Sequence, residues 1–183
     1  MTDAKLAPNL PGWMQDHAKR YLSSGGTEGH MYKMAQPGRP EITVPSLLLT
    51  TTGRKSGDKF MFPLFYGKAG DSYFVVASKG GAPEHPGWYR NILANPDVEV
   101  QVGTAKIKAR ARTAAGEERA RLWEKSLEFW PPYATTKPRR NARSPSLCWI
   151  RSVSLPNGSS EYCSLSAGAA SRSQSAGARA RPS

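Results

Sequence analysis

Two glycine-flanked basic turns carry the side chains best suited to chemistry in this sequence. The first is Gly53-Arg54-Lys55-Ser56-Gly57 and the second is Ser78-Lys79-Gly80-Gly81, and each follows an apolar run. Cationic side chains, hydroxyls and backbone N–H groups that glycines leave accessible together bind extended anions such as phosphates or carboxylates. A solvated basic hairpin turn has the same composition, so the turns alone leave both interpretations open.

The remaining reactive side chains indicate fewer possibilities. His17, His30 and His85 are scattered without a second ligand at metal spacing, so we expect no metal site. No Ser-His-acid or Cys-His arrangement is recognisable, so nothing indicates hydrolysis. Tyr133 follows a Pro-Pro pair and is a candidate proton or hydrogen-bond donor, because a phenol keeps its proton at pH 7. A tyrosine packed below a helix is the alternative.

Strands are the elements that must position these turns. Apolar and β-branched runs predict strands at 44–52, 59–66 and 72–78, and alternation predicts two more at 98–102 and 106–112. Short turns between them favour an antiparallel barrel over a βαβ sheet. The last strand shows a basic face, which is either merely solvated or attractive to nucleic acid or lipid headgroups.

Helices are predicted at 13–22, 86–95 and 113–130. Pro86 suits the start of the second helix, and Asn95-Pro96 ends it. The first helix is amphipathic, with aromatic and basic residues that suit docking on the core, a lid or contact with a membrane surface. We therefore predict a mainly β protein with flanking helices.

Charge is concentrated at the end of the chain. The 183 residues carry a net charge of +12, but residues 135–183 hold eight Lys/Arg against Glu161 alone. Both cysteines also lie there, so the rest of the chain has neither a disulfide framework nor a cysteine-based metal site. With no apolar run of bilayer length, we expect a cytoplasmic protein, with peripheral contact at the inner face of the cell membrane as an alternative.

A series of motifs between residues 40 and 133 resembles the deazaflavin-dependent nitroreductase family, found chiefly in actinobacteria. The motifs occur in the family's order: LLLTTTGRKSG from Leu47, Pro63-Leu64, VVASKGG from Val75, HPGWYRNILANP from His85, VEVQV and the helix that ends WPPY. Each piece is weak alone, whereas their ordered occurrence is specific. The resemblance implies an FMN-binding-type split β-barrel that binds coenzyme F-420.

The activity that the resemblance implies is hydride transfer from reduced coenzyme F-420 to a quinone, nitroaromatic or activated enone acceptor. Its catalytic positions are Tyr133, which orients or protonates the acceptor, and Ser78, which helps to fix it. Its cofactor contacts match Arg54, Lys55, Pro63, Ser78, Lys79, Trp88 and Asn91. Lys59 is a substitute for an arginine that the best-known members carry where this chain has Phe60. Phe65 and Trp130 replace tyrosines of the nitroimidazole-activating member, which predicts a more apolar pocket.

The end of the chain departs from this family. We divide the sequence into an N-terminal segment (1–39) with a short amphipathic helix, a split-barrel domain (40–134) and a basic tail (135–183) that we expect to be disordered. Codons for the tail, re-read with one base inserted before Thr135, can encode the family's closing strand, so we interpret the tail as a frameshift product. As written, it predicts a barrel without its closing strand.

Two alternatives to this function remain at this point. One is an FMN-dependent reductase on the same barrel, and the other is a basic module that binds nucleic acid or an anionic membrane. Most of the excess charge lies in the tail and no nucleic-acid motif is recognisable, so we expect no nucleic-acid partner. The partner that we predict is a small-molecule electron acceptor, and the protein is a monomer or a homodimer.

Overall fold

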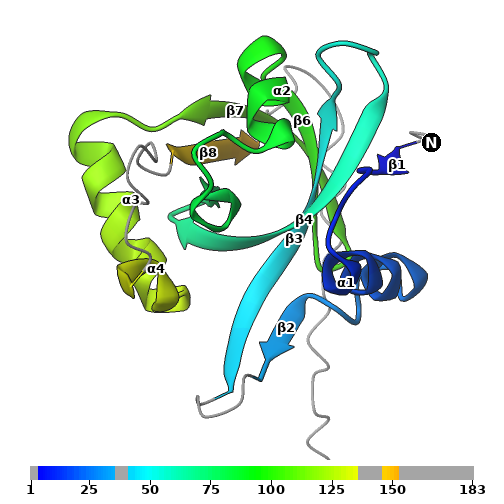
Figure 1. The fold of residues 1–183 in the computed structure, drawn as a ribbon, viewed down its shortest axis with the longest axis horizontal. Helices are drawn as coiled ribbons and strands as arrows, with labels where there is room; N and C mark the ends of the chain where they lie inside the picture. Colours follow the sequence, from blue (N-terminus) through cyan, green and yellow to red (C-terminus); the bar gives the residue numbers. More distant parts are fainter. Residues whose placement is uncertain (1–3, 36–40, 136–145, 153–183) are drawn as a thin grey trace, which may run out of the picture.

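Six antiparallel strands close into a barrel in the computed structural model, which describes residues 4–35, 41–135 and 146–152. Around the barrel the order is β3-β4-β5-β8-β7-β6, and β6 pairs with β3 again. The expected mainly β architecture with flanking helices is confirmed (Figure 1). Its strands are β3 (Ile42–Thr52), β4 (Lys59–Ala69), β5 (Ser72–Ala77), β6 (Asp97–Val102), β7 (Ala105–Thr113) and β8 (Ser146–Ser152).

Two short strands and five helical segments surround this barrel. Strand β2 (Met31–Met34) extends β3 antiparallel, and β1 (Lys5–Leu6) runs parallel to β4. Helices α3 and α4 lie on the opposite side of the molecule from α1 (Figure 1). The helical segments are α1 (Gly12–Ser23), the 3-10 turn η1 (Lys79–Gly81), α2 (Gly87–Ala94), α3 (Gly116–Phe129) and α4 (Pro132–Thr135).

The barrel interior holds the main core. Alternate residues of each strand point inward, so Leu47, Val75 and Val100 from three strands are almost completely buried together. Trp88 and Ile92 of α2 join the same cluster. Burial of each such large side chain stabilises the fold by roughly 1.5–3 kcal/mol, so α2 is fixed firmly against the barrel.

A buried polar cluster attaches α1 to the barrel. His17 Nε2 lies 2.8 Å from the Gly29 carbonyl oxygen and 3.0 Å from Ser46 Oγ. The Tyr21 hydroxyl accepts a hydrogen bond from the Gly103 N–H at 2.6 Å. Burial lowers the pKa of His17 below its ordinary value, so the neutral imidazole is the form that this site favours. The contact is close: a Cβ on Gly26 would overlap the Gly103 carbonyl oxygen.

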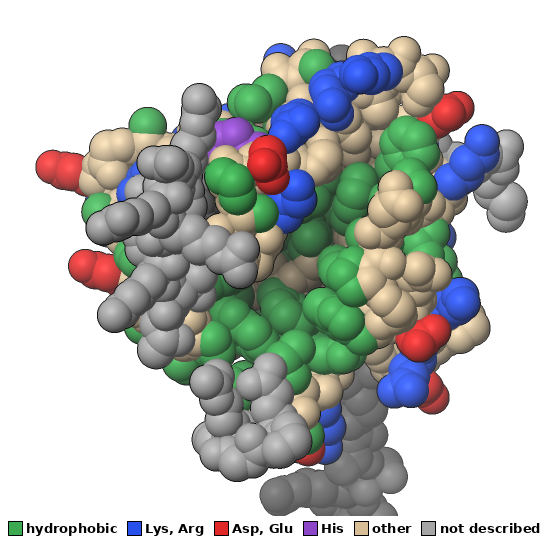
Figure 2. Space-filling model, viewed as in Figure 1, with side chains coloured by type: hydrophobic (Ala, Val, Ile, Leu, Met, Phe, Trp, Pro, Cys, Tyr) green, Lys and Arg blue, Asp and Glu red, His purple; other side chains and the backbone are tan. Residues whose placement is uncertain are grey.

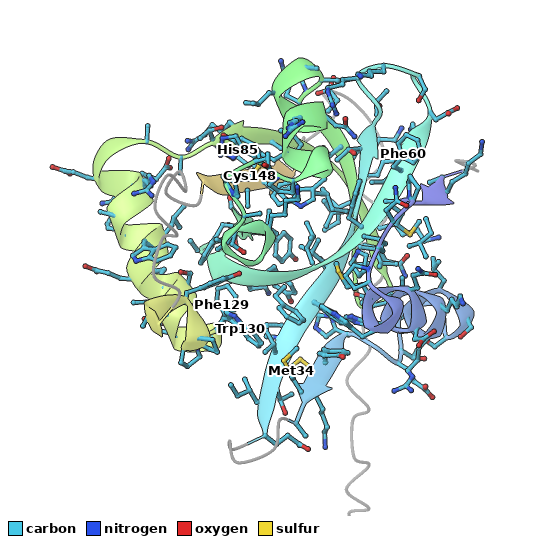
Figure 3. The ribbon with its side chains drawn as sticks, in the orientation of Figure 1. Met34, Phe60, His85, Phe129, Trp130 and Cys148 are labelled. Carbon is cyan, nitrogen blue, oxygen red and sulfur yellow. The ribbon has the colours of Figure 1, made fainter. Side chains whose placement is uncertain are left out.

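The prediction that the chain lacks a closing strand is wrong. Strand β8 pairs with β5 on one side and with β7 on the other, so it completes the barrel. Cys148, labelled in Figure 3, and Ile150 are fully buried in the core, as the period-two pattern of a strand requires. The other residues of the expected tail, 136–145 and 153–183, lie outside the described residues, and the domain limits at 39 and 134 stay predictions.

Candidate functional site

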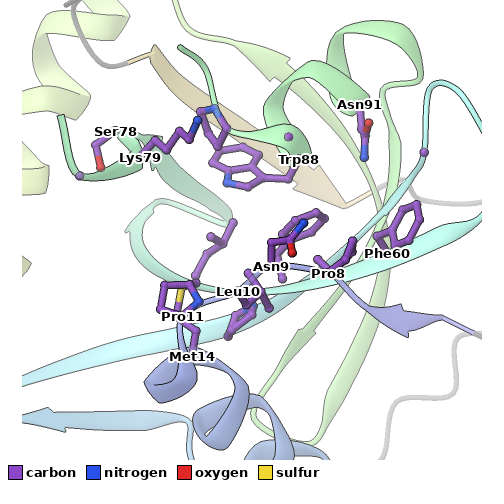
Figure 4. Close-up of a pocket in the computed structure, with 18 of the residues that line it drawn as sticks. Pro8, Asn9, Leu10, Pro11, Met14, Phe60, Ser78, Lys79, Trp88 and Asn91 are labelled. Carbon is purple, nitrogen blue, oxygen red and sulfur yellow. The ribbon is translucent and has the colours of Figure 1, made fainter. Parts of the chain in front are cut away.

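A groove of about 890 Å³ opens on the surface of the barrel, between segments that are far apart in the sequence. Its walls come from the β3–β4 turn, the middle of β4, η1, the start of α2, Tyr133, and residues 7–14, which we call the N-terminal strap (Figure 4). In the space-filling view the hollow is lined with apolar side chains, and Lys and Arg side chains stand along its upper rim (Figure 2). The groove therefore has a cationic wall and an apolar wall.

The first basic turn is held in place by Asn91 of α2. The Arg54 backbone N–H and its Nη1 donate to Asn91 Oδ1 at 3.3 and 3.2 Å. Asn91 Nδ2 in turn donates to Thr51 Oγ1 at 3.1 Å, and the Asn91 side chain is buried. Because a buried amide with both ends bonded cannot rotate freely, it fixes the direction of the guanidinium group. Asn91 thus acts on the groove mainly through Arg54.

The second basic turn places a cation and a hydroxyl on the groove. Ser78 directly precedes η1, and Gly80 within η1 has a φ of 64°, a conformation that glycine adopts without strain. The Lys79 ammonium lies 3.3 Å from a carboxylate oxygen of Glu84, and both side chains are about half exposed. An exposed pair of this kind holds little energy, so Lys79 can turn toward an anion in the groove.

Ser78 and Tyr133 meet at the groove although they are far apart in the sequence. Both line it, and a hydrogen bond to the Ser78 side chain slightly offsets the effect of burial on the phenol. Burial dominates and raises the pKa of Tyr133 to about 12. Tyr133 therefore carries its proton throughout the physiological range and can donate a hydrogen bond.

The charges on the groove have one sign. Arg54, Lys55 and Lys79 line it, and no carboxylate is among the described residues that do. Helix α2 begins at Gly87 on the same groove, so the positive end of its dipole adds to these charges. In the described ranges no group of three His, Cys, Asp or Glu side chains could hold a metal ion. The arrangement favours an organic anion.

Eight of the nine predicted site residues line this groove. Besides the basic residues, Ser78 and Tyr133, these include Pro63 in β4 and the buried Trp88 and Asn91 of α2. Lys59 does not: its Nζ lies 2.6 Å from Glu99 Oε1 on a different part of the surface. Successive residues of a strand point to opposite faces, so Phe60 lines the groove instead. The structure thus does not place Lys59 where it could replace the missing arginine.

The N-terminal strap is the part of the site that sequence reasoning missed. It is attached to β4 by the parallel pairing of β1 and by a hydrogen bond from the Ala7 N–H to the Met61 carbonyl oxygen at 3.0 Å. Gln15 Nε2 donates to the Leu10 carbonyl oxygen at 2.8 Å. The strap residues that line the groove are Ala7, Pro8, Asn9, Leu10, Pro11, Trp13 and Met14.

An aromatic row joins the strap to Tyr133. The ring of Trp13 stacks on Phe65 at 6.2 Å between centroids, and Phe65 lies 5.1 Å from Trp130. Trp130 follows the end of α3 and points toward the strands (Figure 3), 6.4 Å from the ring of Tyr133. Of these rings, Trp13, Phe65 and Tyr133 line the groove, and Trp130 packs behind them. Because Phe65 carries no hydroxyl, it offers apolar surface to the groove.

Comparisons with known proteins agree with this geometry. A family model described as F420H(2)-dependent quinone reductase matches residues 13–144, which leaves most of the strap outside the match. An F420H(2)-dependent quinone reductase of Mycobacterium tuberculosis H37Rv is 43% identical over 110 residues, which are 59% of this chain and 68% of that protein. A protein of Mycobacterium bovis, described as a "Putative F420H(2)-dependent quinone reductase", is likewise 43% identical over 110 residues.

Two solved structures are also similar. One, described as an F420-H2 dependent reductase, has a TM-score of 0.54 and 42% sequence identity, and the match covers 58% of this chain and 94% of that one. The other, described as a domain-swapped dimer, has a TM-score of 0.55 and 37% identity, and the match covers 76% of this chain and 97% of that one. The split β-barrel fold expected from the motifs is confirmed by these neighbours.

Proposed function

The chain belongs to the F420H(2)-dependent quinone reductase family, and on this premise we propose that its groove binds reduced coenzyme F-420 and passes a hydride to a quinone. One observation carries this proposal: a cationic wall without a carboxylate faces an apolar wall that ends at a protonated tyrosine. The coenzyme would supply the hydride when it is bound, which suits a groove with no cysteine among the described residues that line it.

The cationic wall holds the anionic part of the coenzyme. Arg54 is set in direction by Asn91, so its guanidinium can grip an oxyanion without first losing rotational freedom. Lys55 and Lys79 add charge at the two basic turns. Apolar residues such as Pro63 and Trp88 line the groove and would hold the flat ring of the coenzyme. These residues bind and orient, and they exclude water from the transfer.

Tyr133 and Ser78 act on the acceptor. A quinone that takes up a hydride becomes an anion on oxygen, and a neutral phenol at that oxygen stabilises it by a hydrogen bond or donates a proton. The contact with Ser78 keeps the Tyr133 hydroxyl oriented. Nitroaromatics and activated enones develop similar negative charge on hydride transfer, so we include them as acceptors of the same site.

We also propose where in the cell the reaction takes place and in which oligomeric state. None of the helices in the described segments has the length and apolar character that crossing a bilayer requires. The exposed Trp13 and Leu22 of α1 support peripheral membrane contact at a cytoplasmic location. A homodimer or a monomer is compatible with the similar structure described as a domain-swapped dimer.

A titration tests the proposed function. Purified protein is titrated with coenzyme F-420, with FMN and duplex DNA as parallel ligands, and the reduced coenzyme is then mixed with a soluble quinone. We expect saturable binding of coenzyme F-420 at micromolar levels and quinone-dependent loss of the reduced form. Saturable binding of FMN or DNA without binding of coenzyme F-420 would overturn the proposal in favour of an FMN reductase or a nucleic-acid module.

A further inference from the structure

The apolar wall of the groove extends well beyond the point where a quinone ring would react. Leu64 and Phe65 line the groove together with Tyr133, and the ring of Phe65 stacks on Trp13 at the outer end of the strap. Trp13 stays 43% exposed, so the wall runs out to the surface and is not closed by a side chain there. A ring held at Tyr133 would have a continuous apolar path beside it.

We propose that strap residues 8–14, with Trp13 at the outer end, form a specificity-determining wall that binds an extended apolar substituent on the electron acceptor. This inference rests on the proposed function, because it places the reacting ring at Tyr133. Leu10 and Met14 supply the inner part of the wall, as both line the groove (Figure 4). Removing the apolar surface of such a substituent from water provides the binding free energy.

The charges of the groove support the choice of an apolar substituent. Its three cations belong to the two basic turns, whereas the only polar side chain that the strap gives to the groove is that of Asn9. A charged substituent would have no opposite charge on this wall and would lose its hydration there. An alkyl or isoprenoid-like chain has no charge, so it loses no favourable hydration on this wall.

The strap is rigid enough to act as a wall. It is bonded to β4 at Ala7 and to α1 through Gln15, and α1 is attached to the barrel by the buried His17 and Tyr21 cluster. Most of it precedes the residues that the family model matches. The outer residues Trp13 and Met14 fall within the matched range, and the preference is proposed for this chain alone.

A comparison of two acceptors tests this inference. Two benzoquinones that differ only in a methyl or a decyl substituent are compared for kcat/KM with reduced coenzyme F-420 and for binding by equilibrium dialysis. The variants are Trp13→Ala and, as a matched control, Leu22→Ala, since Leu22 lies in the same helix, is also 43% exposed and does not line the groove. Leu10→Ser tests the inner part of the wall.

We expect Trp13→Ala to lower kcat/KM and affinity for the decyl quinone about tenfold, as loss of a hydrophobic contact does, and to leave both values for the methyl quinone unchanged. Leu22→Ala should change neither. The proposal that the strap binds the substituent would be overturned if Trp13→Ala lowered kcat/KM equally for both quinones. It would also be overturned if the unaltered protein bound both quinones with equal affinity. If no quinone is reduced, the proposed function fails. Equilibrium dialysis would still show whether the strap binds the decyl substituent.

Discussion

The two walls of the groove are built in different ways. The cationic wall consists of two turns that each follow directly on a barrel strand, with Arg54 fixed by a buried amide. The apolar wall consists of a strap that reaches β4 through a two-residue parallel strand. Turns at strand ends form the first wall, with one distant contact from Asn91 to Arg54, whereas the second wall depends on distant contacts throughout. Binding of a shared coenzyme and selection of an acceptor can therefore vary independently.

Tyr133 stands where the two walls meet, and its removal should have the largest effect. Tyr133→Phe should lower kcat about 100-fold, within the range for a lost acid catalyst, and leave coenzyme affinity unchanged. Stopped-flow oxidation of reduced coenzyme F-420 measures it. Tyr73→Phe, in which a tyrosine outside the groove loses its hydroxyl, is the control. An unchanged kcat in Tyr133→Phe would show that the Tyr133 hydroxyl takes no part in the reaction.

The pH dependence of the rate examines the same group. The pKa of Tyr133 is raised to about 12 by burial, so the phenol loses its proton only in strongly alkaline solution. The rate of hydride transfer should show no decrease due to this group below about pH 11. A decrease that is present between pH 8 and 10 and absent in Tyr133→Phe would contradict the burial of this hydroxyl.

Arg54→Ala tests the cationic wall and should rank second. The affinity for coenzyme F-420 should fall about 10- to 100-fold, the usual loss for a hydrogen bond to a charged group, with little change in the preference for a decyl quinone. Lys59→Ala is the control, since Lys59 pairs with Glu99 away from the groove. Equal losses in the two variants would instead restore Lys59 as a coenzyme contact. Fluorescence titration at two salt concentrations should show that salt weakens the binding of coenzyme F-420 and leaves the preference for the decyl quinone unchanged.

His17 tests how the apolar wall is held. Its pKa is lowered by burial, so the unfolded chain binds a proton near the ordinary value of 6.5, and the folded chain does so only at lower pH. Stability should therefore decrease as the pH falls below 6.5, toward the pKa of the folded state. Urea unfolding at a series of pH values measures this effect. His17→Gln should flatten the dependence, and an identical slope would exclude His17 as its source.

Substitutions of Asn9 in the strap should have the smallest effect, and they should change only the free energy of unfolding. Its φ of 60° is strained for most residues but tolerated by asparagine. Asn9→Ala should lower stability by about 1 kcal/mol, whereas Asn9→Gly should be within about 0.5 kcal/mol of the unaltered chain. Urea unfolding compares the two variants. Equal stability of both would show that this backbone conformation is not required for folding.

The parts of the fold that were predictable have strong local signals. Strand alternation and short turns predicted the antiparallel barrel, and the glycine-flanked turns predicted that Arg54, Lys55 and Lys79 face one site. Residue motifs in family order extended the prediction to Ser78 and Tyr133, which indeed meet at the groove. The strands, the basic turns and each separate motif can be recognised from a few neighbouring residues.

The parts that were missed depend on distant contacts. The strap is joined to β4 through the two-residue strand β1, which is too short to give a periodic pattern in the sequence. Lys59 was predicted as a cofactor contact but lies away from the groove, because its direction depends on the register of β4, in which it lies opposite Thr52. Strand β8 was overlooked because its short alternating pattern is surrounded by Ser-, Arg- and Pro-rich residues.

The place of β8 has a consequence for how the chain folds. Strands β3 to β5 and the pair β6–β7 join neighbours in the sequence, whereas β8 must insert between β5 and β7 with Cys148 opposite both Val75 and Thr113. Contacts between such distant residues slow folding. On the ribosome, the earlier strands would emerge first and wait with two open edges until residue 152 has left the exit tunnel. Closure of the barrel is then the last and slowest step of its assembly.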